Sequence, residues 1–244
     1  MCGDNRRRAG YDGRMQPGLS KRHLDFGRCL ILAAAFLLTL SPAAPAQAQS
    51  GTAALSSNGR QVVDAHSYPW AAIGRVNHAG IRDRSHCTGT LIGRRLVLTA
   101  AHCLYNPRAQ RWLKASLVHF LAGYQKGKHL AHSVGESYIV SKKFVPKLWN
   151  APSNLPHDWA LLLLKEPLGQ RIGYVGWQAF SNADLADSVA KGANLMQVGY
   201  PQDRAHALSV ASRCVVDASR PGDTLIRHNC LTIAGDSGGP LALL

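Results

Sequence analysis

The sequence predicts an all-β protein, either a barrel or a sandwich. Its apolar residues fall in short runs, about four to eight residues long, that end at Gly, Pro, Asn or charged residues. The chain of 244 residues contains 23 Gly and 12 Pro and is only 7% aromatic, which suits a turn-rich β protein better than a helical bundle. Because 46% of its residues are hydrophobic, the chain can bury a full core.

The expected strands follow one another along the chain after residue 60. The run "TLI" ends at Gly93-Arg94 and "LVLT" begins shortly after it, which predicts a hairpin. The other runs are bounded by turn-forming or charged residues in the same way, and none repeats another. The six runs that we expect to form strands occupy residues 70–76, 90–92, 96–99, 117–121, 159–164 and 195–198.

Residues 1–48 have the pattern of a signal peptide. Several Lys and Arg residues precede an apolar stretch of twelve residues, 29–40, and the small-x-small site Ala46-Gln47-Ala48 follows it. Twelve helical residues span about 18 Å, which is too short for the roughly 30 Å of a bilayer core. We therefore expect a secreted or periplasmic protein with no stable membrane insertion after cleavage.

The N-terminal region contains two possible start residues and a polar segment after the predicted signal peptide. Either Met1 or Met15 can be the true start of the chain. Residues 49–60 are small and polar, and this composition predicts a pro-segment or a flexible linker between the signal peptide and the first strand.

The charge is strongly basic, with 28 Lys and Arg against 14 Asp and Glu, a net charge of +14. An excess of basic residues persists after residue 48, and it favours binding to acidic surfaces such as cell-envelope polymers, or simply keeps the protein soluble. The chain shows no zinc-finger spacing, no aromatic nucleic-acid motif and no concentrated basic run. We do not expect nucleic acid to be a partner.

Four cysteines follow the predicted signal peptide: Cys87, Cys103, Cys214 and Cys230. An even number in an oxidising compartment predicts two disulfides, for which three pairings exist. Pairing in sequence order is the simplest, because each pair then flanks one hairpin-like segment. A zinc site is the alternative, but the chain contains no Cys-x-x-Cys pair. We expect neither a metal nor a cofactor.

Two segments contain candidate acid–base residues. In "LTAAHC", residues 98–103, His102 follows an expected strand and precedes Cys103, whose disulfide would limit the movement of the backbone. A general base requires an imidazole held in one orientation. In "HDWALLLL", residues 157–164, Asp158 lies at the edge of an apolar run, where a carboxylate can orient an imidazole.

A third segment, "AGDSGGP" at residues 234–240, contains a candidate nucleophile, Ser237. Gly235 permits a turn in which its own N–H and that of Ser237 can point at one place, as an oxyanion hole requires. We expect Gly238 and Gly239 to leave room for a substrate beside the hydroxyl.

Taken singly, each residue has a structural explanation as a surface histidine, a turn or cap aspartate, or a turn serine. Together, in the order His102, Asp158, Ser237, the motifs "TAAHC", "HDWALL" and "GDSGGP" resemble the trypsin/chymotrypsin-like serine proteases. The similarity runs from about residue 62 to the last residue. Residues 87–103 also resemble the hairpin before the family's histidine, in which the two cysteines are bridged.

The resemblance implies a fold of two six-stranded antiparallel β-barrels with the site between them. His102 and Asp158 would lie in a first barrel, residues 61–172, and Ser237 in a second, residues 173–244. Family members continue well beyond the serine, whereas here only residues 238–244 follow it. We therefore expect an incomplete second barrel, either in a truncated piece of a complete enzyme or in a degenerate relative.

The resemblance also bears on specificity. "VGYP" at 198–201 and "HNCLT" at 228–232 resemble bacterial secreted members, including the glutamyl-endopeptidase type. Where trypsin-like members have an Asp that binds Arg or Lys, this chain has Leu231, so a preference for basic side chains is not expected. Thr232 would complete the specificity pocket, and its hydroxyl suits a small, polar or acidic side chain.

Asp236 instead resembles the digestive members, in which the corresponding Asp pairs with a new N-terminal amine formed by cleavage after a basic residue. Arg60-Gln61 stands where such a cleavage is expected, although the usual Gly-Gly is missing two residues later. The sequence leaves open whether cleavage activates the protein.

We predict from these observations a secreted serine endopeptidase that hydrolyses peptide bonds through a Ser-His-Asp triad and an acyl-enzyme intermediate. Its partner would be a peptide or protein substrate, and its oligomeric state is left open. The alternative is a catalytically silent, protease-like protein that uses its basic surface to hold an acidic partner.

Overall fold

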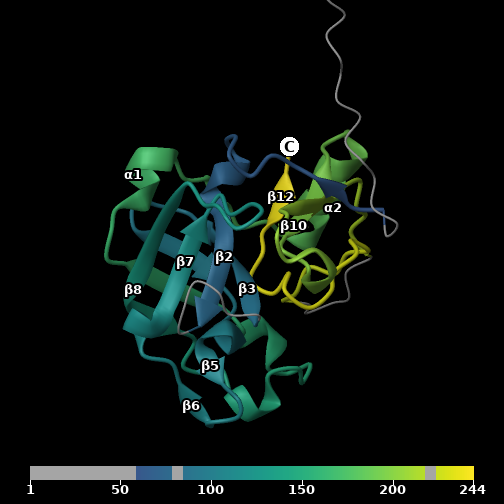
Figure 1. Cartoon of the computed structure of the whole chain (residues 1–244). Coiled ribbons are helices and arrows are strands. Elements are labelled where there is room, and N and C mark those ends of the chain that lie inside the picture. The colour runs from purple at the N-terminus through teal and green to yellow at the C-terminus, as the bar shows by residue number, and fades with distance from the viewer. Residues whose placement is uncertain (1–58, 79–84, 218–223) are drawn as a thin grey trace, which may run out of the picture. The chain divides into compact units, whose positions relative to one another are not determined.

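The computed structural model describes residues 59–78, 85–217 and 224–244. The chain divides into two compact units, residues 1–49 and 50–244, and every described residue belongs to the second unit (Figure 1). The predicted signal peptide and residues 49–58 of the predicted pro-segment lie outside the described residues. Within the described part, no helix is long and apolar enough to cross a membrane.

Six antiparallel strands form a closed barrel in the order β2-β3-β4-β9-β8-β7. Every second residue of β9 is buried, as expected for a strand with one face on the core. The barrel confirms the prediction of an all-β protein. Its strands, labelled in Figure 1 except for β4 and β9, are β2 (Ile73–His78), β3 (His86–Leu91), β4 (Leu96–Thr99), β7 (Val118–Ala122), β8 (Ala131–Val140) and β9 (Ala160–Leu164).

The barrel core consists mainly of aliphatic side chains, together with Phe120 and Phe144, and these side chains are shielded from solvent. The largest of them include Leu91, Leu104, Leu162 and Leu164, which are fully buried. Burying side chains of this size contributes about 1.5–3 kcal/mol each. The barrel is therefore a packed core on which the loops of the site can rest.

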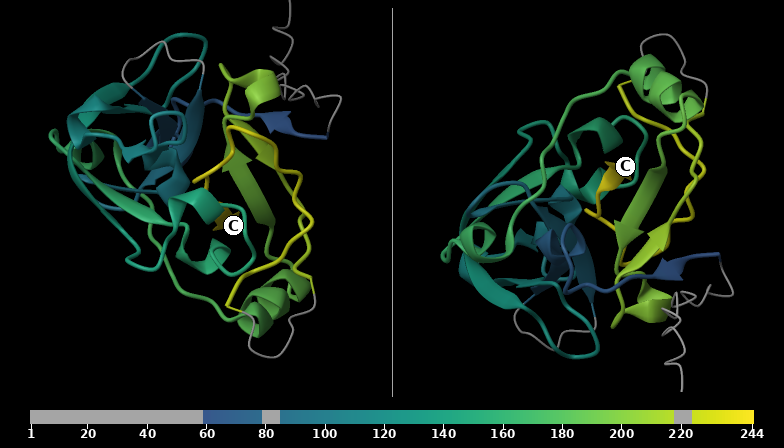
Figure 2. Two further views of the ribbon diagram at one scale, coloured as in Figure 1. Left: turned by 90° about the horizontal axis from the view of Figure 1, so that it is seen from below. Right: turned by 90° about the horizontal axis from the view of Figure 1, so that it is seen from above.

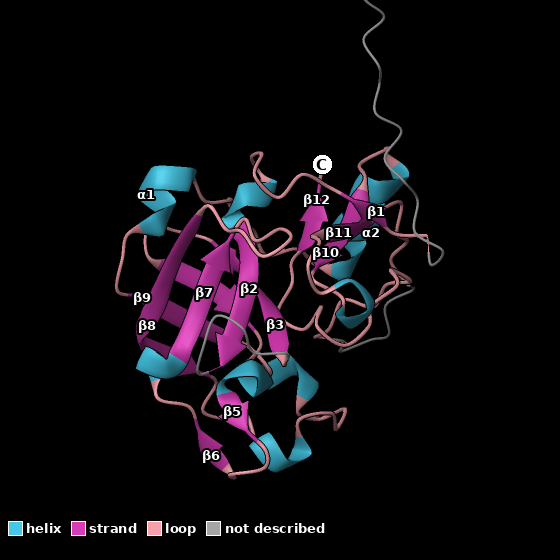
Figure 3. Ribbon diagram, viewed as in Figure 1, coloured by secondary structure: helices cyan, strands magenta, loops and turns pink. Residues whose placement is uncertain are grey.

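A second, open sheet has four strands in the order β1-β11-β10-β12. Figure 3 shows its strands as a group separate from those of the barrel. This arrangement confirms the prediction that the second barrel is incomplete. The strands are β1 (Gln61–Val62), β10 (Leu195–Gly199), β11 (Ser209–Ala211) and β12 (Leu241–Leu243), and α2 (Asn182–Ala190) lies beside them.

Strand β1 departs from the predicted division of the chain. Its residues were assigned to the first barrel, but Gln61 and Val62 pair with Val210 and Ser209 of the second sheet. The described part of the chain therefore runs along the second sheet before it crosses to the barrel. The other predicted boundaries stay predictions.

The remaining elements are short. Strands β5 and β6 form a two-stranded hairpin below the barrel in Figure 1, and Leu168 of α1 packs into the barrel core. Residues 70–72, expected to begin a strand, form a single turn of 3-10 helix before β2. The short elements are β5 (Tyr105–Asn106), β6 (Arg111–Trp112), α1 (Leu168–Ile172), η1 (Trp70–Ala72), η2 (Ala101–Leu104), η3 (Ala115–Leu117), η4 (Pro146–Leu148), η5 (Leu155–His157) and η6 (Gln202–Arg204).

One apolar cluster joins the outside of the barrel to the second sheet. It contains Ile73 and Leu121 from barrel strands, and Val198 and Val210 from β10 and β11. Tyr200 is fully buried in the same cluster, and burial raises the pKa of its phenol above the usual range, so the group stays neutral. In both views of Figure 2 the C-terminus lies between the barrel and the strands of the second sheet.

Both predicted disulfides are present, Cys87–Cys103 and Cys214–Cys230. The first joins β3 to η2, the 3-10 turn that contains His102. The second lies against the second sheet, where both of its cysteines are buried. The first disulfide therefore anchors a turn to a strand, whereas the second joins two loop segments.

A histidine pair on the barrel predicts a loss of stability in mild acid. His119 Nδ1 lies 2.9 Å from His132 Nε2, and burial lowers the pKa of both imidazoles. The unfolded chain then binds protons first as the pH falls below about 6.5, so the free energy of unfolding decreases. We expect Tm to fall between pH 7.5 and pH 5.5, and to fall less in His132→Gln. Equal slopes in His132→Gln and in the exposed control Ser137→Gln would contradict this explanation.

Candidate active site

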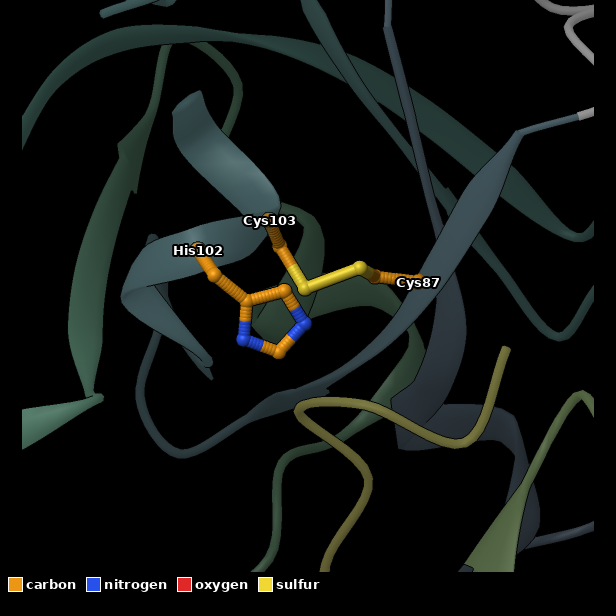
Figure 4. Close-up of side chains that lie close together, drawn as sticks. All are labelled: Cys87, His102 and Cys103. Atoms are coloured by element: carbon orange, nitrogen blue, oxygen red, sulfur yellow. A yellow bond between two sulfur atoms is a disulfide. The ribbon is translucent and has the colours of Figure 1, made fainter. Parts of the chain in front are cut away.

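His102 is fixed by its neighbours in the chain. It lies in η2, directly after β4, and the adjacent Ala101, Cys103 and Leu104 are buried in the barrel core. The Cys87–Cys103 disulfide ties this turn to β3, and Figure 4 shows the imidazole beside it. The His102 side chain is 24% exposed, so one part of the ring stays open to solvent.

Asp158 binds His102 through both carboxylate oxygens. His102 Nδ1 lies 2.6 Å from Asp158 Oδ2, and the backbone N–H of His102 donates to Oδ1 at 2.9 Å. Asp158 follows η5, and its side chain is 11% exposed. Since an ionised carboxylate only accepts hydrogen bonds, the proton of a neutral imidazole lies on Nδ1 and the lone pair on Nε2. This is the tautomer that a general base requires.

Trp149 covers part of the imidazole. Its ring centroid lies 5.1 Å from that of His102, and its side chain is 48% exposed. An aromatic ring at this distance limits the access of water to His102 and contributes apolar contact surface. Trp149 is not among the predicted site residues, because it lies in a loop between η4 and η5 and belongs to no local motif.

The loop that contains Ser237 is bonded to the barrel by Thr88. The Thr88 N–H donates to the carbonyl of Ser237 at 2.9 Å, and its Oγ1 donates to the carbonyl of Gly235 at 2.8 Å. Thr88 Oγ1 also accepts the N–H of Tyr200 at 3.0 Å. A single buried side chain on β3 thus connects the Ser237 loop, the barrel and the end of β10.

The glycines after Ser237 serve a different purpose from the one expected. A Cβ on Gly238, whose φ is +78°, would lie 2.2 Å from Thr99 Oγ1, and one on Gly239 would lie 2.3 Å from the carbonyl oxygen of Val198. Real Cβ atoms do not approach so closely. A side chain on either glycine would meet the barrel or β10, so both glycines are needed for the close packing of the loop.

Ser237 lies close to Cys103, the neighbour of His102 in the chain. Its carbonyl oxygen is 3.8 Å from Cys103 Sγ. Within residues 59–78, 85–217 and 224–244, the Ser237 hydroxyl makes no hydrogen bond, to His102 or elsewhere, and the N–H groups of Gly235 and Ser237 donate none. Catalytic hydrogen bonds are often long before a substrate binds. In the described residues, these three groups thus have no protein partner in place.

Asp236, between Gly235 and Ser237, is buried against Arg60. Arg60 Nη1 lies 2.7 Å from Asp236 Oδ2 and Nη2 lies 3.1 Å from Oδ1, while Arg60 is 1% exposed. Burial raises the pKa of the Asp236 carboxyl, and the Ile233 N–H and the Arg60 guanidinium oppose that shift. The sequence leaves open a cleavage after Arg60; in the structure the Arg60 side chain is buried in the protein.

The sulfur atoms near His102 do not form a metal site. Among the described residues, Cys87, His102 and Cys103 are the one group of three whose potential ligand atoms lie within 4.8 Å of one another. As Figure 4 shows, the two sulfurs are joined in the disulfide, so neither can offer the thiolate that binds a metal. The cluster orients His102 instead.

The residues predicted for the specificity pocket, Leu231 and Thr232, are both exposed. A hollow of about 1080 Å³ lies between the barrel and the second sheet, with Asp158 and Gly238 among the residues that line it. Neither Leu231 nor Thr232 lines this hollow. Their role in specificity stays a prediction.

A family model described as trypsin matches residues 57–244. A glutamyl endopeptidase of Bacillus licheniformis is 26% identical over 149 residues, which is 61% of this chain. That match spans only 42% of the relative's length. The family model therefore covers all three candidate residues, His102, Asp158 and Ser237. The chain spans less than half the length of the glutamyl endopeptidase that it matches.

Solved structures share the fold. A Glu endopeptidase in complex with MPD has a TM-score of 0.57 at 22% identity, covering 75% of this chain and 78% of its own. The protease Anisep from Arthrobacter nicotinovorans has a TM-score of 0.52 at 20% identity, covering 74% and 79%. A thermostable serine protease, AL20, from an extremophilic microorganism has a TM-score of 0.51 at 19% identity, covering 70% and 79%.

The contacts of Thr88 generate a prediction with a matched control. In Thr88→Val, the Tyr200 N–H and the Gly235 carbonyl lose a buried partner, which costs about 1–3 kcal/mol for each unsatisfied group. Thr90 lies on the same strand and is equally buried, but in the described structure its Oγ1 has no hydrogen-bond partner. We expect denaturant unfolding to show a clear loss of stability in Thr88→Val and little or none in Thr90→Val. Similar losses in both would contradict the role given to Thr88.

Proposed function

Because the chain belongs to the trypsin family of serine proteases, we propose that it is a secreted serine endopeptidase that acts through an acyl-enzyme intermediate. The observation that best supports this activity is the His102–Asp158 pair, in which both carboxylate oxygens hold the imidazole. The loop that contains Ser237 contacts Cys103, the neighbour of His102, and we assign the Ser237 hydroxyl as the nucleophile. Fixing an imidazole by a carboxylate next to a serine is the arrangement that activates the hydroxyl as a nucleophile.

In the proposed mechanism, the Ser237 hydroxyl attacks the carbonyl carbon of the scissile peptide bond. His102 Nε2 takes the hydroxyl proton and then gives it to the leaving amine, so that an ester of Ser237 and the free amine remain. Asp158 keeps the Nδ1 proton in place and stabilises the imidazolium. Water then attacks the ester with His102 again as the base, which releases the acid and restores Ser237.

The backbone N–H groups of Gly235 and Ser237 are our candidates for the oxyanion hole. Gly235 has a φ of +95°, a conformation that favours glycine, and a Cβ there would lie 2.3 Å from the carbonyl oxygen of Tyr200. Donors fixed before the reaction stabilise developing charge without reorganisation. Only a glycine at 235 can hold its N–H in this place.

We propose a substrate with a small, polar or acidic side chain before the scissile bond. Leu231 offers no carboxylate to a basic side chain, whereas Thr232 offers a hydroxyl. The excess of basic residues that persists after residue 48 also favours acidic substrates. The relative whose name is glutamyl endopeptidase agrees with this preference. Secretion into an extracellular or periplasmic space follows from the predicted signal peptide at residues 1–48.

The proposed triad predicts that substitutions of its residues cause large losses of activity that do not add. We expect Ser237→Ala and His102→Ala each to lower kcat by up to about a millionfold, and the double variant to lose little more, because the residues act as a unit. A fluorophosphonate should label the wild type but not Ser237→Ala. The exposed control Ser137→Ala should leave both readouts unchanged.

Two outcomes would contradict the activity. Additive losses in the double variant would exclude a shared mechanism. A folded wild-type protein that neither reacts with the fluorophosphonate nor hydrolyses peptides would favour the alternative, a silent protease-like protein that binds an acidic partner.

The proposed substrate class predicts a ranking of peptides that differ only in the residue before the scissile bond. We expect kcat/KM to be at least about a hundredfold lower for Arg or Lys than for Glu or Ser, because a cation would be desolvated without a partner. Thr232→Val should reduce the activity toward Glu and Ser more than toward Ala. A preference for Arg or Lys in the wild type would reject this substrate class.

A further inference from the structure

The side chain of Arg60 is buried against the second sheet, although Arg60 lies near the start of the described chain. Its Nη1 donates to the carbonyl of Leu231 at 2.8 Å, and its Nη2 donates to the carbonyl of Ser209 at 3.0 Å. Together with the two bonds to Asp236, these contacts use both terminal nitrogens of the guanidinium. A buried arginine is tolerated only when it is paired and hydrogen-bonded, so the site is built for this one cation.

The carboxylate that Arg60 holds is part of the loop that contains Ser237. Asp236 Oδ2 also accepts the N–H of Ile233 at 3.0 Å, and the Asp236 N–H donates to the Ile233 carbonyl at 3.1 Å. The Gly239 N–H donates to the carbonyl of Asp236 at 2.8 Å. The conformation of the turn on both sides of Ser237 therefore depends on the place of the Asp236 side chain.

The backbone of Arg60 is fixed by the strand that follows it. Gln61 and Val62 form β1 on the edge of the second sheet, and the Val63 N–H donates to the carbonyl of Leu208 at 3.1 Å. The guanidinium reaches Asp236 while the peptide bond between Arg60 and Gln61 is intact. Hydrolysis of that bond would leave the guanidinium on a separate fragment that β1 no longer anchors.

We propose that Arg60 is a positioning residue for the reaction, acting through Asp236 on the Ser237 loop, and that the active form keeps the Arg60–Gln61 bond. The inference rests on the proposed endopeptidase activity. It assigns the buried positive charge beside Asp236 to a side chain of the uncut chain rather than to a new amine at Gln61. Processing that activates or matures the protein then has to end before Arg60, and cleavage after Arg60 inactivates the enzyme.

The expected effect of losing Arg60 is on kcat. Asp236 would keep a buried carboxyl without its cation, and the turn that contains Gly235 and Ser237 would move. A displacement of about 1 Å between reacting groups can lower a rate about a hundredfold. Because Arg60 lies behind the loop and is 1% exposed, it has no surface with which to bind a substrate, so KM should change little.

The first experiment compares variants of the full chain. We expect Arg60→Gln to lower kcat about a hundredfold or more with little change in KM, and Arg60→Lys, which keeps the charge, to lose less. The double variant Arg60→Gln with Asp236→Asn, which leaves two neutral amides, should recover part of the kcat lost in Arg60→Gln. The control is Arg75→Gln, since Arg75 is 3% exposed but lies against the Tyr124 ring.

The fraction of folded protein, followed by circular dichroism at the assay temperature, separates positioning from unfolding. If Arg60→Gln does not fold, Arg60→Lys and the double variant provide the test. Two results would overturn the proposal. One is a loss of kcat in Arg75→Gln equal to that in the Arg60 variants. The other is a kcat of the double variant no higher than that of Arg60→Gln.

The second experiment identifies the N-terminus of the active species. Wild-type protein is labelled with a fluorophosphonate and the labelled chain is analysed by mass spectrometry. We expect the labelled chain to contain an uncut Arg60–Gln61 bond. A labelled chain that begins at Gln61 would overturn this inference while supporting the proposed function. The absence of any labelled chain would instead reject the proposed function.

Discussion

The contact between Thr88 and the Ser237 loop is the interaction on which the geometry of the candidate site depends. Thr88 bonds the carbonyls of Gly235 and Ser237, and its neighbour Cys87 is bridged to Cys103, next to His102. Two adjacent residues of β3 therefore fix the two sides of the site. Because β3 lies in a closed barrel, neither side can move without disturbing a packed core.

The loop is held from its other side by the second sheet. Asp236 meets the guanidinium of Arg60, which also donates to the carbonyl of Ser209 in β11. A buried ion pair of this kind contributes little net stability, but removing one partner alone costs about 3–5 kcal/mol. Its effect is to permit one arrangement of the loop and to penalise others. Thr88 and Arg60 thus act on the same few residues from opposite sides.

The parts of this structure that could be predicted from the sequence are those with local signals. The disulfides, five of the six barrel strands and the closeness of His102 to Asp158 were expected, whereas β8 (Ala131–Val140) was not among the predicted strands. Helix α2 has a signal that was overlooked, Ser181 with Asp184 three residues later, whose N–H it caps. Contacts between distant segments carried no such signal. Arg60 and Asp236 are 176 residues apart, and nothing near Arg60 distinguishes a buried partner from a cleavage point.

The site therefore consists of two halves with different origins. The candidate base, His102, and the Asp158 carboxylate are placed by the first barrel alone, since η2 and η5 both flank strands of that barrel. The serine is placed by contacts from three segments distant in sequence: Thr88, Tyr200 and Arg60. The two halves meet only when the barrel and the second sheet pack together through their shared apolar cluster. Substitutions in that cluster, far from His102, should consequently act on the serine half and leave the His102–Asp158 pair in place.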